Sequence, residues 1–193
     1  YVGPFGYGWH HTFDDALLVT DQFAIWRTPD GRHVDLLPLD VGHDYYDRAE
    51  RVTVSRDQVG FRLRSSDGVT RRYTPLTNEF EADGETVTYV LRDVTSRAGH
   101  RISCRYDDAG RLASIQDSGG RLIGFDYDDL NRIIALTAPH PDLVDERFAV
   151  GRYAYDEVGN LLSLTDSRDH VFRYGYMGHL LTTETDRTGL TFT

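Results

Sequence analysis

A tyrosine–aspartate turn recurs along the second half of the chain, and this repeat most strongly restricts the fold. The interval from Tyr106 to Tyr127 is 21 residues, that to Tyr155 is 28, and that to Tyr176 is again 21. Self-similarity at a fixed period of 20 to 50 residues is the signature of a repeat architecture. The first three copies read Tyr106-Asp107-Asp108-Ala109-Gly110-Arg111-Leu112, Tyr127-Asp128-Asp129-Leu130-Asn131-Arg132-Ile133 and Tyr155-Asp156-Glu157-Val158-Gly159-Asn160-Leu161. The fourth, Tyr176-Met177-Gly178-His179-Leu180, is shorter and has Met177 in place of the aspartate.

A second set of turn residues lies between the tyrosines. Asp117 and Asp166 each follow their tyrosine by 11 residues. The three copies read Asp117-Ser118-Gly119-Gly120, Asp166-Ser167-Arg168-Asp169 and Asp186-Arg187-Thr188-Gly189. Asp can cap its own backbone, and Gly or Asn supplies the left-handed position that a tight turn requires. The longer central interval is interpreted as a loop insertion, because Ala138-Pro139-His140-Pro141-Asp142 contains two prolines.

The segments between these turns alternate with a period of two. Ile102, Cys104 and Tyr106 share one side of an extended segment, and the same pattern returns at Ile123-Phe125-Tyr127 and Phe172-Tyr174-Tyr176. This period is typical of half-buried β-strands. One repeat is therefore strand, turn, strand, turn, and each hairpin buries its apolar face by stacking on its neighbours. We predict an all-β fold of antiparallel hairpin repeats with no helix.

The first half of the chain is also predicted to be β, with a less regular register. Asp30-Gly31, Asp67-Gly68 and Asp83-Gly84 are hairpin signals between strand-like runs. The segment from Val41 to Glu50 is interpreted as a long polar loop. We expect two domains, with residues 1–95 forming a β domain that precedes the repeats and residues 96–193 forming about four repeats.

Composition excludes several classes of function. All 21 basic residues are arginine, so lysine chemistry such as a Schiff base or a phosphate-loop lysine is absent from the chain. The single cysteine excludes internal disulfides and multi-cysteine zinc sites. The net charge of −10 argues against a nucleic-acid partner. No run of about 18 apolar residues is present, so we expect no membrane span.

The candidate chemical sites are each better explained by structure. The glycine spacing in Gly3-Pro4-Phe5-Gly6-Tyr7-Gly8-Trp9 resembles a nucleotide loop, but no strand precedes it and no helix follows. His10-His11 and Asp14-Asp15, and the group Asp126, Asp128 and Asp129, are interpreted as solvated or turn-capping residues rather than metal ligands. Cys104 lies mid-strand on the apolar side, which is typical of a buried thiol. We therefore expect no catalytic residue, no metal and no cofactor.

Arginines recur on the polar side of the predicted strands or directly after turn glycines. Arg101, Arg105 and Arg173 are examples of the first placement, and Arg111 is an example of the second. On adjacent strands such side chains can pair with carboxylates and stack on tyrosine rings. A solvated charged face is the simpler interpretation for any one of them, because exposed pairs contribute only about 0–1 kcal/mol.

The repeat at Tyr106 to Leu112, with its intervening Asp-x-x-Gly turns, resembles the YD repeats of bacterial Rhs proteins. The opening Gly3-Pro4-Phe5-Gly6-Tyr7-Gly8-Trp9, followed by Asp30-Gly31-Arg32 and Asp67-Gly68, is similar to the domain that precedes those repeats. The resemblance implies a β-sheet that spirals into a hollow cage around a C-terminal toxin. It assigns structural roles to Tyr106, Asp107, Gly110, Arg111, Asp117, Gly120, Tyr127, Asp128, Tyr155, Asp156, Gly159, Asp166, Tyr176, Gly178, Asp186 and Gly189 of the repeats, and to Gly3, Pro4, Gly6, Gly8 and Trp9 of the opening motif.

The function implied by the resemblance is that of a non-enzymatic wall segment of an Rhs polymorphic-toxin cage. The implied partners are the remainder of the cage, the enclosed toxin, and secretion spike or chaperone proteins. Related effectors are exported by the type VI secretion system in interbacterial competition, which implies the bacterial cytoplasm before export and then delivery to a target cell. About four repeats are too few to close a cage, so we expect further repeats to follow Thr193 in the whole protein.

Two other functions stay open from the sequence. A carbohydrate- or cell-surface-binding β module would use the abundant Tyr and Trp residues, with Trp9 and Trp26 as the candidates. A hydrolase would need a carboxylate pair, and the many Asp and Glu residues do not single one out.

Overall fold

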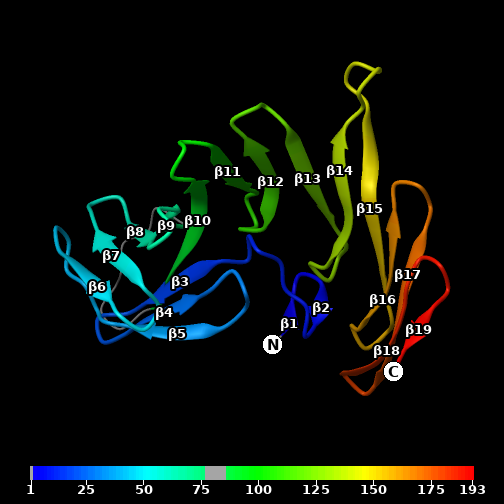
Figure 1. Ribbon diagram of the computed structural model, residues 1–193, viewed down its shortest axis with the longest axis horizontal. Coiled ribbons are helices and arrows are strands. Elements are labelled where there is room, and N and C mark those ends of the chain that lie inside the picture. Colours follow the sequence, from blue (N-terminus) through cyan, green and yellow to red (C-terminus); the bar gives the residue numbers. More distant parts are fainter. Residues whose placement is uncertain (1, 77–85) are drawn as a thin grey trace. The chain divides into compact units, whose positions relative to one another are not determined.

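The computed structural model describes residues 2–76 and 86–193, and within these ranges the chain is entirely β (Figure 1). The described residues form no helix, so none of them belongs to a helix that could cross a bilayer. The strands of the described residues pair with antiparallel neighbours. The prediction of an all-β fold built from antiparallel hairpins is confirmed.

The chain divides into two compact units, which we describe separately. Unit 1 contains residues Tyr1–His10, Arg111–Ser114 and Arg121–Thr193, and unit 2 contains His11–Gly110 and Ile115–Gly120. The opening segment of the chain therefore belongs with the later repeats rather than with the residues that follow it. The predicted boundary at residue 95 stays a prediction.

Unit 2 is a meander of strands that returns to its own first strand. The strand β10 pairs with β9 along Tyr89–Thr95 and with β3 along Val87–Val90. The strands that belong to unit 2 are β3 (Ala16–Val19), β4 (Ala24–Arg27), β5 (His33–Leu36), β6 (Asp44–Asp47), β7 (Val52–Arg56), β8 (Phe61–Ser65), β9 (Thr70–Pro75), β10 (Val87–Thr95) and β11 (Arg101–Tyr106), while β12 (Leu112–Asp117) has residues in both units.

The core of unit 2 follows from the alternation along its strands. On β8, Phe61 and Leu63 are buried while Arg62 and Arg64 are exposed. Leu17 on β3 and Leu91 on β10 are fully buried on the same side as Tyr73. Each such aliphatic side chain contributes about 1.5–3 kcal/mol when removed from water, so this apolar face holds the strands together.

One loop prediction in this unit is wrong. Residues Asp44–Asp47, inside the segment interpreted as a long polar loop, form β6 and pair with β7 in the register Tyr45↔Val54 and Tyr46↔Thr53. Two aspartates with low β propensity flank the tyrosines and hide the strand signal, and pairing with β7 overrides that local preference. The predicted turn at Asp30-Gly31 lies between β4 and β5, and the one at Asp67-Gly68 lies between β8 and β9. The predicted turn at Asp83-Gly84 lies outside the described residues.

Unit 1 is a run of hairpins in chain order, with a short hairpin from the N-terminus packed against it. Figure 1 shows the repeat strands side by side in the order of the sequence. Its strands are β1 (Val2–Gly3), β2 (Gly6–Tyr7), β13 (Leu122–Tyr127), β14 (Ile133–Pro139), β15 (Arg147–Tyr155), β16 (Leu161–Asp166), β17 (Val171–Met177), β18 (Leu180–Thr185) and β19 (Thr191–Phe192). Of the predicted loop insertion from Ala138 to Asp142, Ala138 and Pro139 instead belong to β14 and pair with Phe148 and Arg147, because strand pairing overrides the local proline signal. The connection itself comprises residues 140–146.

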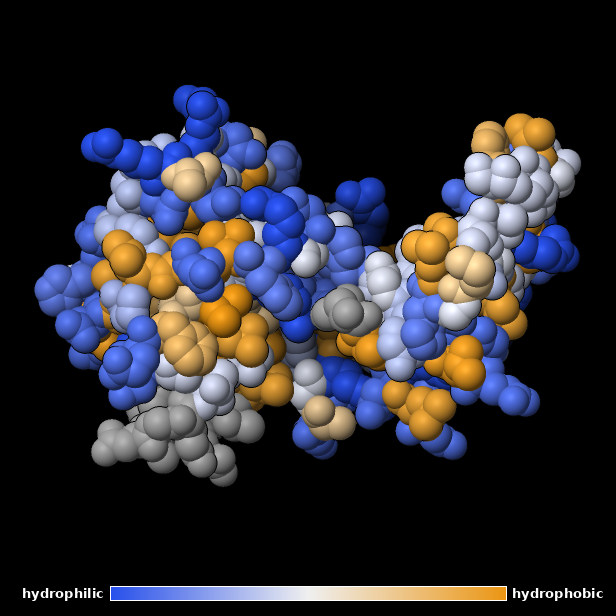
Figure 2. All heavy atoms as spheres, turned by 90° about the horizontal axis from the view of Figure 1, so that it is seen from below, coloured by the Kyte–Doolittle hydropathy of each residue, from blue (hydrophilic) through white to orange (hydrophobic). Residues whose placement is uncertain are grey.

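Unit 1 buries less apolar surface than unit 2. Phe125, Ile133 and Leu161 are buried, but Leu180 and Phe192 are more than half exposed. Figure 2 shows apolar side chains reaching the surface among hydrophilic ones on the face that it displays.

Candidate functional site

The Tyr-Asp turns share one hydrogen-bonding pattern. The carboxylate Oδ1 of each turn aspartate accepts the backbone N–H two residues ahead, for example Ala109 to Asp107 at 3.0 Å and Val158 to Asp156 at 3.1 Å. The residue that follows then has positive φ, at Gly110 (79°) and Gly159 (94°). The same pairing of capping aspartate and left-handed residue occurs at Asp117–Gly120, Asp128–Asn131, Asp166–Asp169 and Asp186–Gly189.

The hairpins that begin with Tyr127, Tyr155 and Tyr176 each contain a register shift. Tyr127 pairs with Ile133 while Asp126 pairs with Ala135, so Ile134 is an extra residue. The same shift leaves Leu162 extra opposite Tyr155 and Thr182 extra opposite Tyr176. A β-bulge of this kind bends its strand and changes the direction of a side chain. The bulge therefore recurs with the repeat, directly at the tyrosine.

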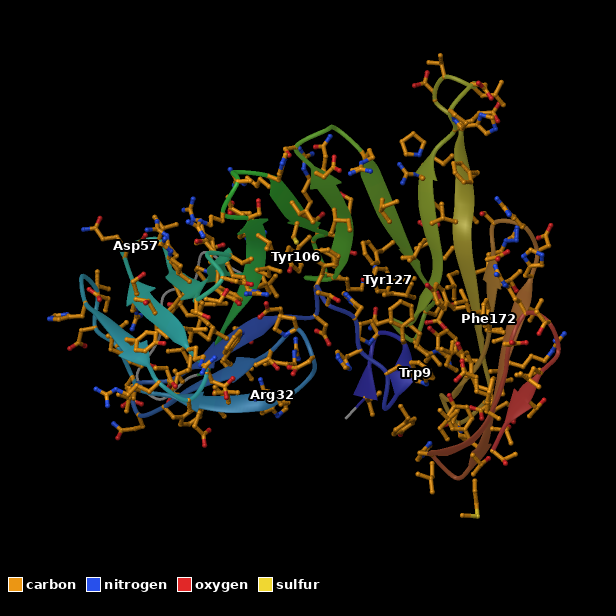
Figure 3. All side chains as sticks on the ribbon, viewed as in Figure 1. Trp9, Arg32, Asp57, Tyr106, Tyr127 and Phe172 are labelled. Atoms are coloured by element: carbon orange, nitrogen blue, oxygen red, sulfur yellow. The ribbon has the colours of Figure 1, made fainter. Side chains whose placement is uncertain are left out.

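The repeated tyrosine hydroxyls each join one hairpin to the preceding strand. In unit 1, Tyr127 Oη donates to the carbonyl of Leu112 at 3.0 Å and Tyr176 Oη donates to that of Leu161 at 3.0 Å. Tyr155 does the same to Ile133 at 2.6 Å. In unit 2, Tyr106 donates to Leu91 at 2.9 Å. We call these four tyrosines the tyrosine ladder; Tyr106 and Tyr127 are labelled in Figure 3.

An arginine covers the ring of three of the ladder tyrosines. The guanidinium carbon lies 5.2 Å from the ring centre for Arg92 over Tyr106, 4.8 Å for Arg111 over Tyr127 and 4.6 Å for Arg132 over Tyr155. Cation–π contacts of this type contribute about 0.5–1 kcal/mol at partly exposed sites. Desolvation by burial also raises the pKa of Tyr155 and of Tyr106, so their hydroxyls stay protonated as donors. Three of the four ladder tyrosines are thus hydroxyl donors whose rings pack against a cation.

At the fourth ladder tyrosine the arginine is replaced by Asn160. This side chain is buried and bonds to Asp156, to the carbonyl of Gly178 and to His179. The indole Nε1 of Trp9 donates to the Tyr176 hydroxyl at 2.8 Å. The N-terminal segment therefore contacts the ladder at the position where a repeat lacks its arginine.

The opening glycine-aromatic motif is a structural contact surface for the repeats. The backbone N–H of Ile133 donates to the carbonyl of Pro4 at 2.7 Å, and the N–H of Tyr7 donates to that of Gly159 at 3.2 Å. Phe5 packs on Tyr153 with ring centres 4.7 Å apart. We call residues Val2–Trp9 the N-terminal clasp. Gly3 and Gly6 belong to the short strands of its hairpin, while Gly8 has positive φ and open space around it.

Gly6 is required for this close approach. Its φ is 85°, and a Cβ at this position would lie 2.3 Å from the carbonyl oxygen of Gly159. Such a distance excludes any side chain unless the backbone moves. A left-handed glycine of the clasp therefore lies directly against a left-handed glycine of a Tyr-Asp turn.

A buried carboxylate in unit 2 was missed as a structural centre by the sequence reasoning. Asp15, considered there among solvated residues, is 1% exposed and its Oδ1 accepts hydrogen bonds from Trp26 Nε1 and Tyr73 Oη, both at 2.8 Å. The Nε of Arg71 lies 3.3 Å from the second oxygen. Desolvation by burial raises the pKa of Asp15 to about 6, against the lowering effect of these donors. The partners are up to 58 residues apart in sequence, and no local pattern connects them.

The other predicted candidates hold structural contacts. Asp14 forms an ion pair with Arg27 at 2.6 Å, and Asp128 forms one with Arg132 at 2.7 Å. Cys104 is buried, and desolvation raises the pKa of its thiol to about 12. Within residues 2–76 and 86–193, no three His, Cys, Asp or Glu side chains gather as a metal site. Trp26 is 5% exposed, so the fold leaves no indole face there for a sugar.

Two family models match the chain. The RHS Repeat family matches residues 106–140 and 155–191, and a domain of unknown function, DUF6531, matches residues 1–36. The first match contains all four ladder tyrosines, and the second contains the N-terminal clasp and Asp15.

Individual relatives are distant and much longer than this chain. Double-stranded DNA deaminase toxin A of Burkholderia cenocepacia (strain H111) is 28% identical over 99% of this chain, which spans 13% of that protein. A crystal structure of TcdB2-TccC3 has a TM-score of 0.39 at 13% identity, over 84% of this chain and 8% of the other. The Tc holotoxin pore of Photorhabdus luminescens has a TM-score of 0.29 at 15% identity, over 89% of this chain and 12% of the other.

The family matches cover the same residues in which the structure repeats its capped turns, bulges and tyrosine hydrogen bonds. The chain is therefore an Rhs, or YD-repeat, protein.

Proposed function

We propose that this chain is a non-enzymatic wall segment of an Rhs toxin cage. The observation that carries the proposal is the tyrosine ladder, because the same donor and acceptor recur at all four tyrosines. A bulge accompanies three of them, Tyr127, Tyr155 and Tyr176. A set of contacts that repeats with the architecture serves the architecture, whereas a catalytic site is assembled once. The structural roles that the resemblance assigns to residues of the repeats and of the opening motif belong to this proposal.

The proposed cargo is a toxin that lies C-terminal to the cage in the whole protein. The relative from Burkholderia cenocepacia is named as a DNA deaminase toxin, and this chain spans 13% of its length. Zinc-dependent deaminases of bases use a histidine with two cysteines, or three cysteines, as metal ligands. This chain has one cysteine, and it is buried. A deaminase of that class therefore has to reside outside this segment.

The route of the whole protein is part of the same proposal. We propose assembly in the bacterial cytoplasm with the remaining cage, followed by export through the type VI secretion system and delivery to a competing cell. Secretion spike or chaperone proteins are the proposed partners. The support is the family membership of the chain, and the remainder of the gene product supplies the test.

Protection of the C-terminal segment from protease tests the cage directly. In the full-length protein, trypsin is expected to leave the segment after the last repeat intact under native conditions. Tyr106→Ala and Tyr155→Ala should each weaken the wall and make that segment cleavable, while Tyr46→Phe, at an exposed tyrosine, should not. A segment cleaved equally in the natural protein and in all variants overturns the cage. A gene product without further YD repeats after Thr193 overturns it as well.

A further inference from the structure

Positive charge is concentrated in one part of unit 2, although the whole chain is acidic. Residues 51–75 contain six arginines and two aspartates, whereas the net charge of the chain is −10. These residues form β7, β8 and β9 with their turns. A local concentration of one sign creates a potential that attracts counter-ions even when the overall charge has the opposite sign.

The six arginines are not equivalent in the fold. Arg56 points to the apolar side, where it donates to the carbonyl of Leu39, and Arg71 lies beside the buried Asp15. Arg62 and Arg64 alternate with the buried Phe61 and Leu63, so they lie on the outer face of β8.

Cross-strand neighbours extend this outer face with further donors. Arg62 is paired with Arg72 on β9 and with Ser55 on β7. Arg64 is paired with Thr70 on β9 and with Thr53 on β7. Two like charges directly opposite each other on adjacent strands destabilise a sheet. The carboxylate of Asp57 lies close to both arginines of this pair and partly offsets their repulsion.

A groove of about 600 Å³ lies over this face of β7 to β10. We call it the arginine groove. Its lining comprises Asp44, Thr53, Ser55, Arg62, Arg64, Gly68, Thr70, Thr95, Ser96 and Arg97. Three guanidinium groups and five hydroxyl groups thus face one space, with one carboxylate at Asp44.

Counter-charges on the residues that the structure describes leave part of this groove without an ion pair. Arg62 lies 3.9 Å from Asp57, whose side chain is 54% exposed, and Figure 3 labels Asp57 at the adjoining turn. Across the described ranges, neither Arg64 nor Arg97 has a carboxylate within ion-pair distance. Two guanidinium groups are therefore available to an external anion.

We propose that the arginine groove binds a tetrahedral oxyanion, a phosphate or sulfate group. The paired N–H groups of a guanidinium match the spacing of two phosphate oxygens. The four oxygens of a tetrahedral group do not lie in one plane, so several donors can bind them from different sides. The donors of the groove lie on β7 to β10 and on the turn after β10, so they surround an acceptor from several directions. This arrangement suits a tetrahedral group better than a planar carboxylate, whose two oxygens one guanidinium group can bind. The groove takes either a free anion or a phosphate ester of a larger molecule.

Amide chemical shifts of the full chain, measured by NMR at low ionic strength, test this site. The probes are sodium phosphate, sodium pyrophosphate and glucose 6-phosphate, with glucose and ionic-strength-matched sodium chloride as controls. We expect saturable shifts confined to the amides of β7 to β10 and of Arg97, and tighter binding of pyrophosphate than of phosphate. Tighter binding of glucose 6-phosphate than of phosphate identifies an ester ligand, and equal binding identifies the free anion.

Variants separate the groove from general charge attraction. Arg64→Gln and Arg97→Gln should each raise the Kd at least tenfold, since each removes an unneutralised guanidinium. Arg168→Gln is the matched control, because Arg168 is an exposed arginine in a turn of unit 1. Unchanged shifts outside the groove show that the variants fold. The proposal is overturned if none of the three anions gives saturable shifts there, if glucose gives the same shifts, or if the control loses as much affinity.

Discussion

The backbone of Ile133 is held from two sides, by the Tyr155 hydroxyl and by the carbonyl of Pro4. Tyr155 Oη donates to the Ile133 carbonyl at 2.6 Å, while the Ile133 N–H donates to Pro4 at 2.7 Å. Ile133 itself is fully buried at the start of β14. One residue therefore joins a Tyr-Asp turn, the following hairpin and the N-terminal clasp, which lies more than 120 residues away in sequence.

Removing a ladder hydroxyl should cost less than removing the ring. Tyr155→Phe loses the hydrogen bond to the Ile133 carbonyl, so we expect a loss of about 1 kcal/mol in the free energy of unfolding. Tyr155→Ala also loses the packed ring beneath Arg132, and about 3 kcal/mol is expected. Urea denaturation followed by far-ultraviolet circular dichroism measures both.

Tyr106 provides an internal comparison for this result. Tyr106→Phe and Tyr106→Ala should show the same order of losses as the Tyr155 pair, because the contacts are equivalent. Tyr46→Phe, at a side chain that is 55% exposed, should stay within about 0.5 kcal/mol of the natural chain. Equal stability of the natural chain and Tyr155→Ala would contradict the structural role of the ladder.

Two glycines of the clasp form a matched pair for a steric test. Gly6 and Gly8 both have positive φ, at 85° and 76°, so alanine is strained at either position by about 1 kcal/mol. A Cβ at Gly6 would also overlap the Gly159 carbonyl, whereas a Cβ at Gly8 meets no atom within 4 Å. Gly6→Ala should therefore lower the thermal unfolding midpoint clearly more than Gly8→Ala. Equal midpoints would show that the clasp does not approach the turn this closely.

The buried Asp15 predicts a titration near neutral pH. Because burial raises its pKa from 3.8 to about 6, the folded state binds the proton more tightly than the unfolded state. The free energy of unfolding should therefore gain about 1 kcal/mol from this group as the pH falls from 7 to 5, and lose it again as the pH rises through 6. The Asp15 carboxyl ¹³C shift, followed by NMR, should have its midpoint near pH 6.

Asp15→Asn provides the control for this titration. The amide keeps an oxygen acceptor for Trp26 and Tyr73 but has no proton to gain, so the gain between pH 7 and 5 should shrink by the same amount. Turn aspartates act in the opposite sense at lower pH: the pKa of Asp186 is lowered, first by the hydrogen bond from Thr188. Their stabilisation should disappear only below about pH 4. A carboxyl midpoint below pH 4 at Asp15 would contradict the effect of burial.

The Trp9–Tyr176 hydrogen bond predicts how the clasp is held. Trp9→Phe retains an aromatic ring against Tyr174, 5.0 Å away between ring centres, but removes the donor to Tyr176. We expect faster amide hydrogen exchange at Tyr7 and at Ile133, whose N–H groups bond across the clasp, by about fivefold. Exchange at the buried Leu63 of β8, in unit 2, is the internal reference. An unchanged ratio between these sites would show that Trp9 does not hold the clasp.

The turns and strands of the repeats followed from local chemistry, which is why the sequence predicts them well. An aspartate that caps its own backbone and a glycine at positive φ act within five residues, as at Asp107 and Gly110. Alternation along β8 or β11 likewise depends on the nearest neighbours in the chain. The strand at Asp44–Asp47 was not predicted, because it forms through its pairing with β7 and not through its own β propensity.

The sequence alone thus determined the fold class, the period and the turn residues, since each depends on contacts made within one hairpin. Tertiary structure alone decided that the N-terminal clasp contacts the repeats, that Asp15 meets Trp26 and Tyr73, and that arginines collect on the outer face of β8. These contacts join residues far apart in the chain, and no periodicity encodes such distances. These contacts stabilise the protein only after the strands have paired. A single sequence therefore shows the residues that can take part, but not which of them contact one another.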